Sequence, residues 1–122
     1  MLAQELRLEV DIDKELAEHA RNATSFLPQA EFQEKIAQMF ANPNKLVFGE
    51  EAADEALERF SRALERACLN AGGNDFLVVT HGTVLSIYVS RRLGIDVLSL
   101  WRSLTMPMAI VISGKEMEII RA

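Results

Sequence analysis

The feature that most constrains the fold is an uninterrupted apolar run from Phe76 to Thr80 (FLVVT), followed directly by His81 and Gly82. Such a short run, rich in β-branched residues, predicts a strand buried on both faces of an α/β sheet. A helical pattern then extends over residues 83–93 and ends at Gly94, a residue suited to a helix C-terminus. His81 therefore falls at the carboxyl end of the strand that we expect at the centre of the core.

Strand-like and helical patterns lie on both sides of this unit, and the loops between them carry turn residues. The helix that begins near Glu51 carries the pairs Glu55-Arg59 and Glu58-Arg62, which we expect to be surface ion pairs. The predicted elements are strands at residues 7–12, 108–112 and 116–120, helices at 28–41 and 51–69, and a loop at 13–27.

The composition is that of one globular domain, with 122 residues of which 49% are hydrophobic. Thirteen Lys and Arg against 18 Asp and Glu give a net charge of -5 without a basic stripe, so we expect no nucleic-acid partner. The lone Cys68 excludes an internal disulfide and a thiolate zinc cluster, which fits a cytoplasmic protein. Residues 1–10 lack a signal-peptide pattern and no run reaches transmembrane length, so no membrane association is expected. We expect no metal ion and no cofactor.

His81 is the first candidate functional residue, because ligands of open α/β sheets bind beyond the carboxyl ends of the strands. The amides of Gly82, Thr83 and Val84 would begin the next helix, where the helix dipole and unpaired N–H groups favour an anion. An imidazole at that position can bind a phosphoryl oxygen. The alternative is a histidine that closes the end of a strand for structural reasons.

Three segments of the chain together resemble one family. Residues 78–84 (VVTHGTV) resemble the second histidine motif of the histidine phosphatase, or phosphoglycerate mutase-like, superfamily. Residues 10–19 (VDIDKELAEH) resemble the segment in which that family carries its proton-donating glutamate. Residues 49–60 (GEEAADEALERF) resemble its Gly-Glu-Ser helix start and its later arginine. The motifs follow the family's order and cover most of the chain.

The resemblance implies a three-layer α/β fold of the phosphoglycerate mutase type and phosphoryl transfer through a phosphohistidine. Glu18 would be the acid for the leaving group. His81, with the amides of Gly82 and Thr83, would bind the phosphoryl group of a phosphorylated small molecule, or phosphate itself. Phosphoryl transfer depends mainly on positioned donors and charges, and a carboxylic acid can protonate the departing alkoxide, so these roles are chemically sound.

The family's nucleophile belongs to an Arg-His-Gly motif on its first strand, and this sequence has no such motif. The other histidine, His19, is neither preceded by arginine nor followed by glycine, so it is not assigned that role. By position, residues 1–122 form a single partial domain that misses the family's first strand and most of its first helix. We therefore expect a phosphatase or mutase as the full-length parent, and an inactive chain on its own.

Two other kinds of function are compatible with the sequence. One is a non-catalytic module that uses His81 and the adjacent helix start to bind phosphate. The other is an assembly module that pairs through its sheet. Without a neighbouring strand, the segment from Phe76 to Thr80 would have an unpaired edge, and such an edge favours pairing with another chain. We accordingly expect a homodimer through this edge.

Overall fold

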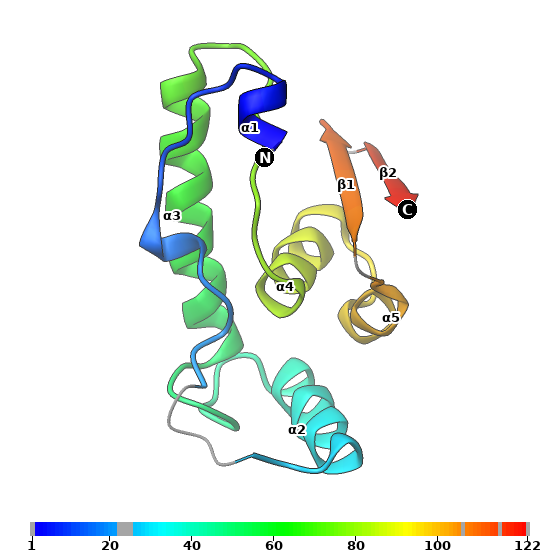
Figure 1. Cartoon of the computed structure of the whole chain (residues 1–122). Coiled ribbons are helices and arrows are strands. Elements are labelled where there is room, and N and C mark those ends of the chain that lie inside the picture. The colour runs from blue at the N-terminus through cyan, green and yellow to red at the C-terminus, as the bar shows by residue number, and fades with distance from the viewer. Residues whose placement is uncertain (1, 22–25, 106, 115, 122) are drawn as a thin grey trace.

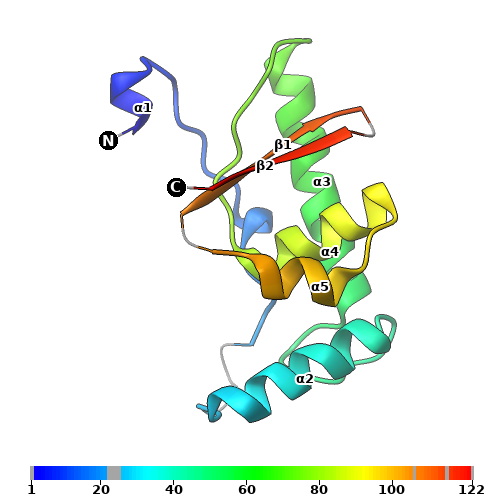
Figure 2. The same cartoon turned by 90° about the vertical axis from the view of Figure 1, so that its right-hand side faces the viewer.

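The computed structural model describes residues 2–21, 26–105, 107–114 and 116–121, and its helices and one hairpin are shown in Figure 1. Helix α3 is the longest element, α4 lies beside it, and α5 lies beside α4 on the side away from α3. Figures 1 and 2 both place α2 on one side of α5 and the hairpin on the other. The elements in chain order are α1 (Leu2–Glu5), the 3-10 turn η1 (Lys14–Leu16), α2 (Gln29–Ala41), α3 (Ala53–Ala71), α4 (Gly82–Leu93), α5 (Val97–Ser103), β1 (Met108–Ser113) and β2 (Glu116–Arg121).

The ends of α3 and α4 follow from local signals in the sequence. Ala52 has no side-chain acceptor to cap α3, but the carboxylate of Glu55 accepts a hydrogen bond from the Ala52 amide at 2.9 Å. This is one half of a capping box. Helix α3 ends at Gly72 and α4 ends at Gly94, both with positive φ, as left-handed C-terminal caps require. The predicted helices at 28–41, 51–69 and 83–93 are therefore confirmed within one or two residues at their ends.

Two apolar clusters form the core. The first joins Ile36 and Met39 of α2 to Ile87 of α4 and to the start of α3, and Trp101 of α5 packs against it. The second joins Ala56 and Phe60 of α3 to Val84 of α4. Tyr88 packs on Phe60 with ring centroids 5.4 Å apart. The second cluster fixes α3 against α4, and these two helices carry the candidate site.

The strand predicted from Phe76 to Thr80 is the main correction to the sequence analysis. The segment has no strand assignment in the structure and is not buried on both faces. Phe76 is 46% exposed, Leu77 59% and Val79 82%. A strand requires neighbouring strands that accept and donate its backbone hydrogen bonds. In the described part of the chain, no other segment supplies them at this place.

The other strand predictions have mixed outcomes. Residues 7–12 contain no strand, and their apolar side chains are exposed, with Ile12 at 90%. The C-terminal hairpin is confirmed, because β1 and β2 pair antiparallel with Ile110 opposite Ile119. The short helix α5 was not predicted; the Asp96 side chain caps it by accepting from the Ser99 amide at 2.8 Å. The architecture is thus a mixture of helices with a small antiparallel sheet, consistent with the α/β class.

Candidate functional site

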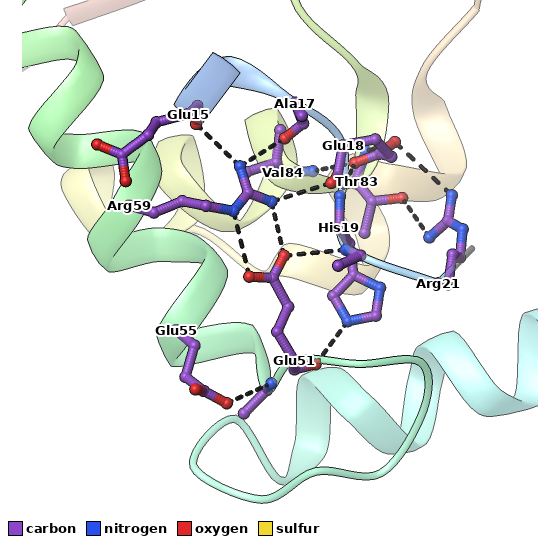
Figure 3. Close-up of polar contacts among 12 residues, drawn as sticks. Glu15, Ala17, Glu18, His19, Arg21, Glu51, Glu55, Arg59, Thr83 and Val84 are labelled. Carbon is purple, nitrogen blue, oxygen red and sulfur yellow. Dashed lines mark hydrogen bonds and ion pairs between the residues drawn. The ribbon is translucent and has the colours of Figure 1, made fainter. Parts of the chain in front are cut away.

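Glu18 binds the first turn of α4. Its carboxylate accepts hydrogen bonds from the Thr83 amide at 2.9 Å and from the Val84 amide at 2.8 Å. Helix α4 has His81 at its N-cap, without a side-chain cap of its own. Glu18 thus satisfies two N–H groups that a helix start leaves unpaired, and its charge is stabilised by the helix dipole. Figure 3 shows this carboxylate lying above Thr83 and Val84.

Arg59 of α3 holds the backbone that carries Glu18. Its Nη1 donates to the carbonyl oxygens of Glu15 at 2.8 Å and Ala17 at 2.7 Å, and its Nη2 donates to that of Glu18 at 2.9 Å. The guanidinium also donates to the Glu51 carboxylate through Nε at 3.1 Å and Nη2 at 2.6 Å. These five hydrogen bonds match the five N–H donors of an arginine, so no donor remains for a ligand.

Glu51 completes this arrangement from the other side of the loop. Its Oε1 accepts from the Ala20 amide at 2.9 Å in addition to its two bonds from Arg59. The side chains of Glu51 and Arg59 are only 13% and 16% exposed. Burial acts to raise the pKa of Glu51, but the hydrogen bonds from Arg59 and Ala20 and the charge of Arg59 outweigh it and lower that pKa. We call Arg59, Glu51 and the loop residues 15–20 the Arg59 clamp.

His19 is buried inside the clamp, with 2% of its surface exposed. Its Nε2 lies 2.7 Å from the carbonyl oxygen of Glu51, and its ring stacks on Phe48 with centroids 5.9 Å apart. Gly49 lies against the same ring at a φ of +74°, and a Cβ there would lie 2.3 Å from the Ala20 carbonyl oxygen. His19 therefore has a packing role in this structure.

Arg21 is a cationic residue of the site that the sequence analysis missed. Its guanidinium lies over the ring of Phe32, 5.0 Å from the centroid, and Nη2 is 3.7 Å from a Glu18 carboxylate oxygen. Its Nη1 donates to the Thr83 hydroxyl at 3.4 Å, and the Trp101 indole donates to the same oxygen at 3.2 Å. Trp101 thus packs beneath the start of α4, and Arg21 places positive charge there.

His81 occupies the N-cap position of α4 in an extended backbone conformation, and its side chain is exposed. Its carbonyl accepts the first bond of the helix, from the Leu85 amide at 3.1 Å. No residue of the described ranges forms a hydrogen bond with its imidazole. Gly82 follows it, and a Cβ at Gly82 would lie 3.3 Å from a methyl of Leu104. His81 is therefore accessible to a ligand at the same end of α4 that Glu18 binds.

A shallow depression of about 290 Å³ lies beside this helix start. Arg21 and Glu18 contribute opposite charges to it, and His81 does not line it. Within the described ranges, no group of three or more His, Cys, Asp or Glu residues is arranged to hold a metal ion. No helix in that part of the chain is long and apolar enough to cross a membrane. The residues lining the depression are Ala17, Glu18, His19, Ala20, Arg21 and Arg59.

The family model of the histidine phosphatase superfamily (branch 1) matches residues 1–115. The chain belongs to this superfamily. Neither a curated protein nor a solved structure gives a significant match. The superfamily assignment confirms the resemblance that the segments around Glu18, Glu51 and His81 indicated, and the mixed helical and strand content is consistent with it.

Proposed function

We propose that this chain is the phosphate-recognition part of a histidine phosphatase domain acting on a phosphorylated small molecule. In this proposal His81 binds a phosphoryl oxygen, and the bound phosphoryl group displaces Glu18 from the helix amides, so that its carboxylate takes up a proton from solvent and then donates it to the departing alkoxide. The observation that carries the proposal is the pair of hydrogen bonds from the Thr83 and Val84 amides to Glu18. They bring the carboxylate to the end of α4 at which His81 stands, although the two residues are far apart in the sequence.

The same hydrogen bonds define how an anion would compete at this helix start. A phosphoryl group bound by His81 and the Gly82 amide reaches the Thr83 amide only if Glu18 gives up that donor. Arg21 then offsets part of the repulsion between the carboxylate and the phosphoryl group, because its guanidinium lies 3.7 Å from Glu18. We therefore expect His81 and Arg21 to strengthen phosphate binding and the Glu18 charge to weaken it.

Titration with inorganic phosphate, followed by amide chemical shifts, tests this assignment. His81→Ala should weaken binding by about tenfold, the loss expected for one hydrogen bond to a charged group. Glu18→Gln should strengthen binding by several-fold, because the competing charge is removed while the side-chain shape is kept. Glu65→Gln, at an exposed residue of α3, is the control for net charge. Equal affinity of the wild type and His81→Ala would refute the assignment.

The nucleophile is a separate matter, because these 122 residues contain no Arg-His-Gly motif. We propose that the chain by itself has no appreciable phosphatase activity, since a phosphohistidine route needs that histidine and its charge-stabilising arginines. The measurement is hydrolysis of a generic phosphate ester by protein free of contaminating phosphatase. Activity that disappears in His81→Ala would show that the chemistry is assigned wrongly.

A second candidate function is assembly through the 76–80 segment, and the exposure of its side chains favours it. Leu77 and Val79 are 59% and 82% exposed in a segment without regular secondary structure. None of the residues 76–80 is charged, so two copies can pair there without bringing like charges together. Residues 8–12 also lack regular secondary structure, but they contain Glu9 and Asp11, which would repel a second copy. We propose a two-fold homodimer through the 76–80 segment.

A further inference from the structure

Glu18 owes its position to contacts made by its neighbours as well as by its side chain. The loop around it has little regular structure, because η1 covers only Lys14–Leu16. Its carbonyl oxygens must find partners outside the loop. Three of them, at residues 15, 17 and 18, converge on the single guanidinium of Arg59 (Figure 3). The backbone of Glu18 is therefore fixed to α3.

The side chain of the same residue is fixed to a different helix. The Glu18 carbonyl accepts from Arg59, and the Glu18 carboxylate accepts from the Thr83 and Val84 amides of α4. Helices α3 and α4 are themselves held together by the cluster that contains Phe60 and Val84. Glu18 thus spans two elements whose separation is set by core packing. A displaced loop backbone would carry the carboxylate away from the amides.

Glu51 extends this control to the residues that follow Glu18. It fixes the orientation of Arg59 through a two-point contact, and it accepts the Ala20 amide through Oε1. The loop is consequently held on both sides of Glu18, by Arg59 before it and by Glu51 after it. Both side chains are largely buried, which limits competition from water for the hydrogen bonds between them. The orientation of Arg59 is therefore maintained.

The outer arginines of α3 make a contrasting set of contacts. Arg66 donates to the carboxylates of Asp13 and Glu15, and Arg62 donates to Glu15. These contacts are more exposed and involve side chains only, at the beginning of the loop. They bind the loop to α3 without reaching residues 17–20. Arg66 is therefore a matched control for Arg59 in helix, charge and partner loop.

We propose that Arg59, oriented by Glu51, is a positioning residue that places the Glu18 carboxylate against the start of α4. The inference rests on the role proposed for Glu18 as the acid beside the phosphoryl group. It adds that the pocket-lining guanidinium of Arg59 does not bind phosphate, because its five donors are already taken by the loop and by Glu51. Among the residues that line the depression, the cation available to a ligand is instead Arg21.

The Thr83 and Val84 amide resonances report this placement directly, without any ligand. Glu18→Gln provides the reference, because it replaces the charged acceptor and should move both amide proton shifts upfield. Arg59→Met should move them in the same direction and increase the rate of hydrogen exchange at both amides. Arg66→Met should leave them at the wild-type values. Wild-type shifts for both amides in folded Arg59→Met would overturn the proposal.

Glu51→Gln provides a second measurement if Arg59→Met does not fold. It keeps the side-chain shape but has one acceptor oxygen in place of the carboxylate's two, so it cannot make all the hydrogen bonds that Glu51 accepts from Arg59 and Ala20. The Thr83 and Val84 amide shifts should therefore move part of the way toward the Glu18→Gln values. Unchanged shifts in Glu51→Gln would count against positioning by the pair. If the Thr83 and Val84 amide shifts respond to the variants as expected but the wild-type protein binds no phosphate, only the proposed function is refuted. The positioning proposal does not depend on phosphate binding.

Discussion

The Arg59 clamp and the 76–80 segment show opposite relations between sequence and burial. The clamp consists of charged and polar groups in an irregular loop, but His19, Glu51 and Arg59 within it are largely buried. The 76–80 segment is apolar, but Leu77 and Val79 are exposed. In the clamp, each buried polar group of Glu51 and Arg59 has a partner, which is the condition for burying charge. Among the residues that the structure describes, the 76–80 segment has no neighbouring strand, so its apolar side chains have no sheet in which to be buried.

This difference separates two sources of order in the molecule. The loop is ordered by hydrogen bonds that end on α3 and α4, both of which are formed by local sequence signals. The apolar segment depends on partners that are distant in sequence or belong to another chain. A hydrogen bond joins the two regions, because the Thr80 hydroxyl donates to the Leu16 carbonyl at 2.8 Å. Substitutions in the Arg59 clamp should therefore mainly lower stability, whereas substitutions in the 76–80 segment should mainly change assembly.

The largest effect is expected from removing the centre of the clamp. Arg59→Met should lower the free energy of unfolding by roughly 3–5 kcal/mol, because it leaves the buried Glu51 charge and three loop carbonyls without their donor. Urea denaturation measures this loss. The double variant Arg59→Met/Glu51→Leu should recover part of it, since the uncompensated charge is gone. A loss under 1 kcal/mol in the single variant would mean that the clamp contributes little to stability.

Gly49→Ala should have the next largest effect, at roughly 2–4 kcal/mol. The substitution adds a Cβ that would lie 2.3 Å from the Ala20 carbonyl oxygen, at a φ of +74°. That oxygen accepts the Glu50 amide at 2.7 Å, so relief of the clash disturbs the clamp.

Gly94→Ala is the matched control for this substitution. It has a similar φ of +70° but no atom within 4 Å of the added Cβ, so it should cost only about 1 kcal/mol. Comparing the losses in free energy of unfolding of the two variants, by thermal or urea denaturation, separates the cost of the close contact from the cost of the positive φ. Equal losses in the two variants would show that the close approach at Gly49 is tolerated.

The 76–80 segment should respond in assembly more than in stability. Val79→Lys places a charge on its most exposed side chain, and in a two-fold dimer the two lysines would repel each other. We expect the dissociation constant of the dimer to rise by about tenfold, which corresponds to about 1.4 kcal/mol. Sedimentation at low micromolar concentration measures the shift.

Leu69→Lys is the control for the assembly experiment, because Leu69 is 81% exposed on α3 and lies outside the segment. It should leave the association state unchanged. A monomeric wild type at all accessible concentrations would refute the homodimer. A dimer that Leu69→Lys weakens and Val79→Lys does not would place the interface on α3.

Local signals account for the parts of the fold that the sequence predicted. The breaks at Pro28, Gly72 and Gly94 and the helical spacing between them were sufficient for α2, α3 and α4, because each helix satisfies its own backbone. The same reasoning failed at residues 76–80 and 7–12. Hydrophobic pattern and β-branching indicate that a segment suits a sheet, but they do not supply the neighbouring strand. Helix α5 was missed, although Asp96 is a suitable N-cap, because the helix is too short to show a clear helical pattern of apolar residues.

The candidate site was predictable only in part for a related reason. His81 was identified from its place between an apolar run and a helix start and then by resemblance to a family, and Glu18 by that resemblance. The structure places both residues at the start of α4. The partner of Arg59 was predicted wrongly, because helical spacing favours Glu55 four residues earlier, whereas the structure pairs Arg59 with Glu51. Glu51 lies outside the helix, so no helical periodicity relates the two. The role of Arg21 depends on the path of an irregular loop, which side-chain spacing does not encode.

The smallest effect is expected at the outer edge of the clamp, in its response to acid. Hydrogen bonds from Arg62 and then Arg66 lower the pKa of Glu15 from 4.5 to about 2. A carboxyl whose pKa is lower in the folded protein stabilises the fold above its unfolded pKa. Its contribution should therefore be complete above pH 4.5 and decline as the pH falls toward about 2.

Urea denaturation across this interval should show a decline in stability that is shallower in Glu15→Gln, which cannot be protonated there, and unchanged in Glu65→Gln. Because Glu15 and its arginines are partly exposed, 0.5 M salt should weaken the contribution, whereas it should affect the buried Arg59–Glu51 pair much less. Equal acid sensitivity of Glu15→Gln and the wild type would show that Glu15 does not contribute. Equal salt sensitivity of the Arg59→Met and Arg62→Met losses would instead remove the distinction between a buried clamp and its exposed edge.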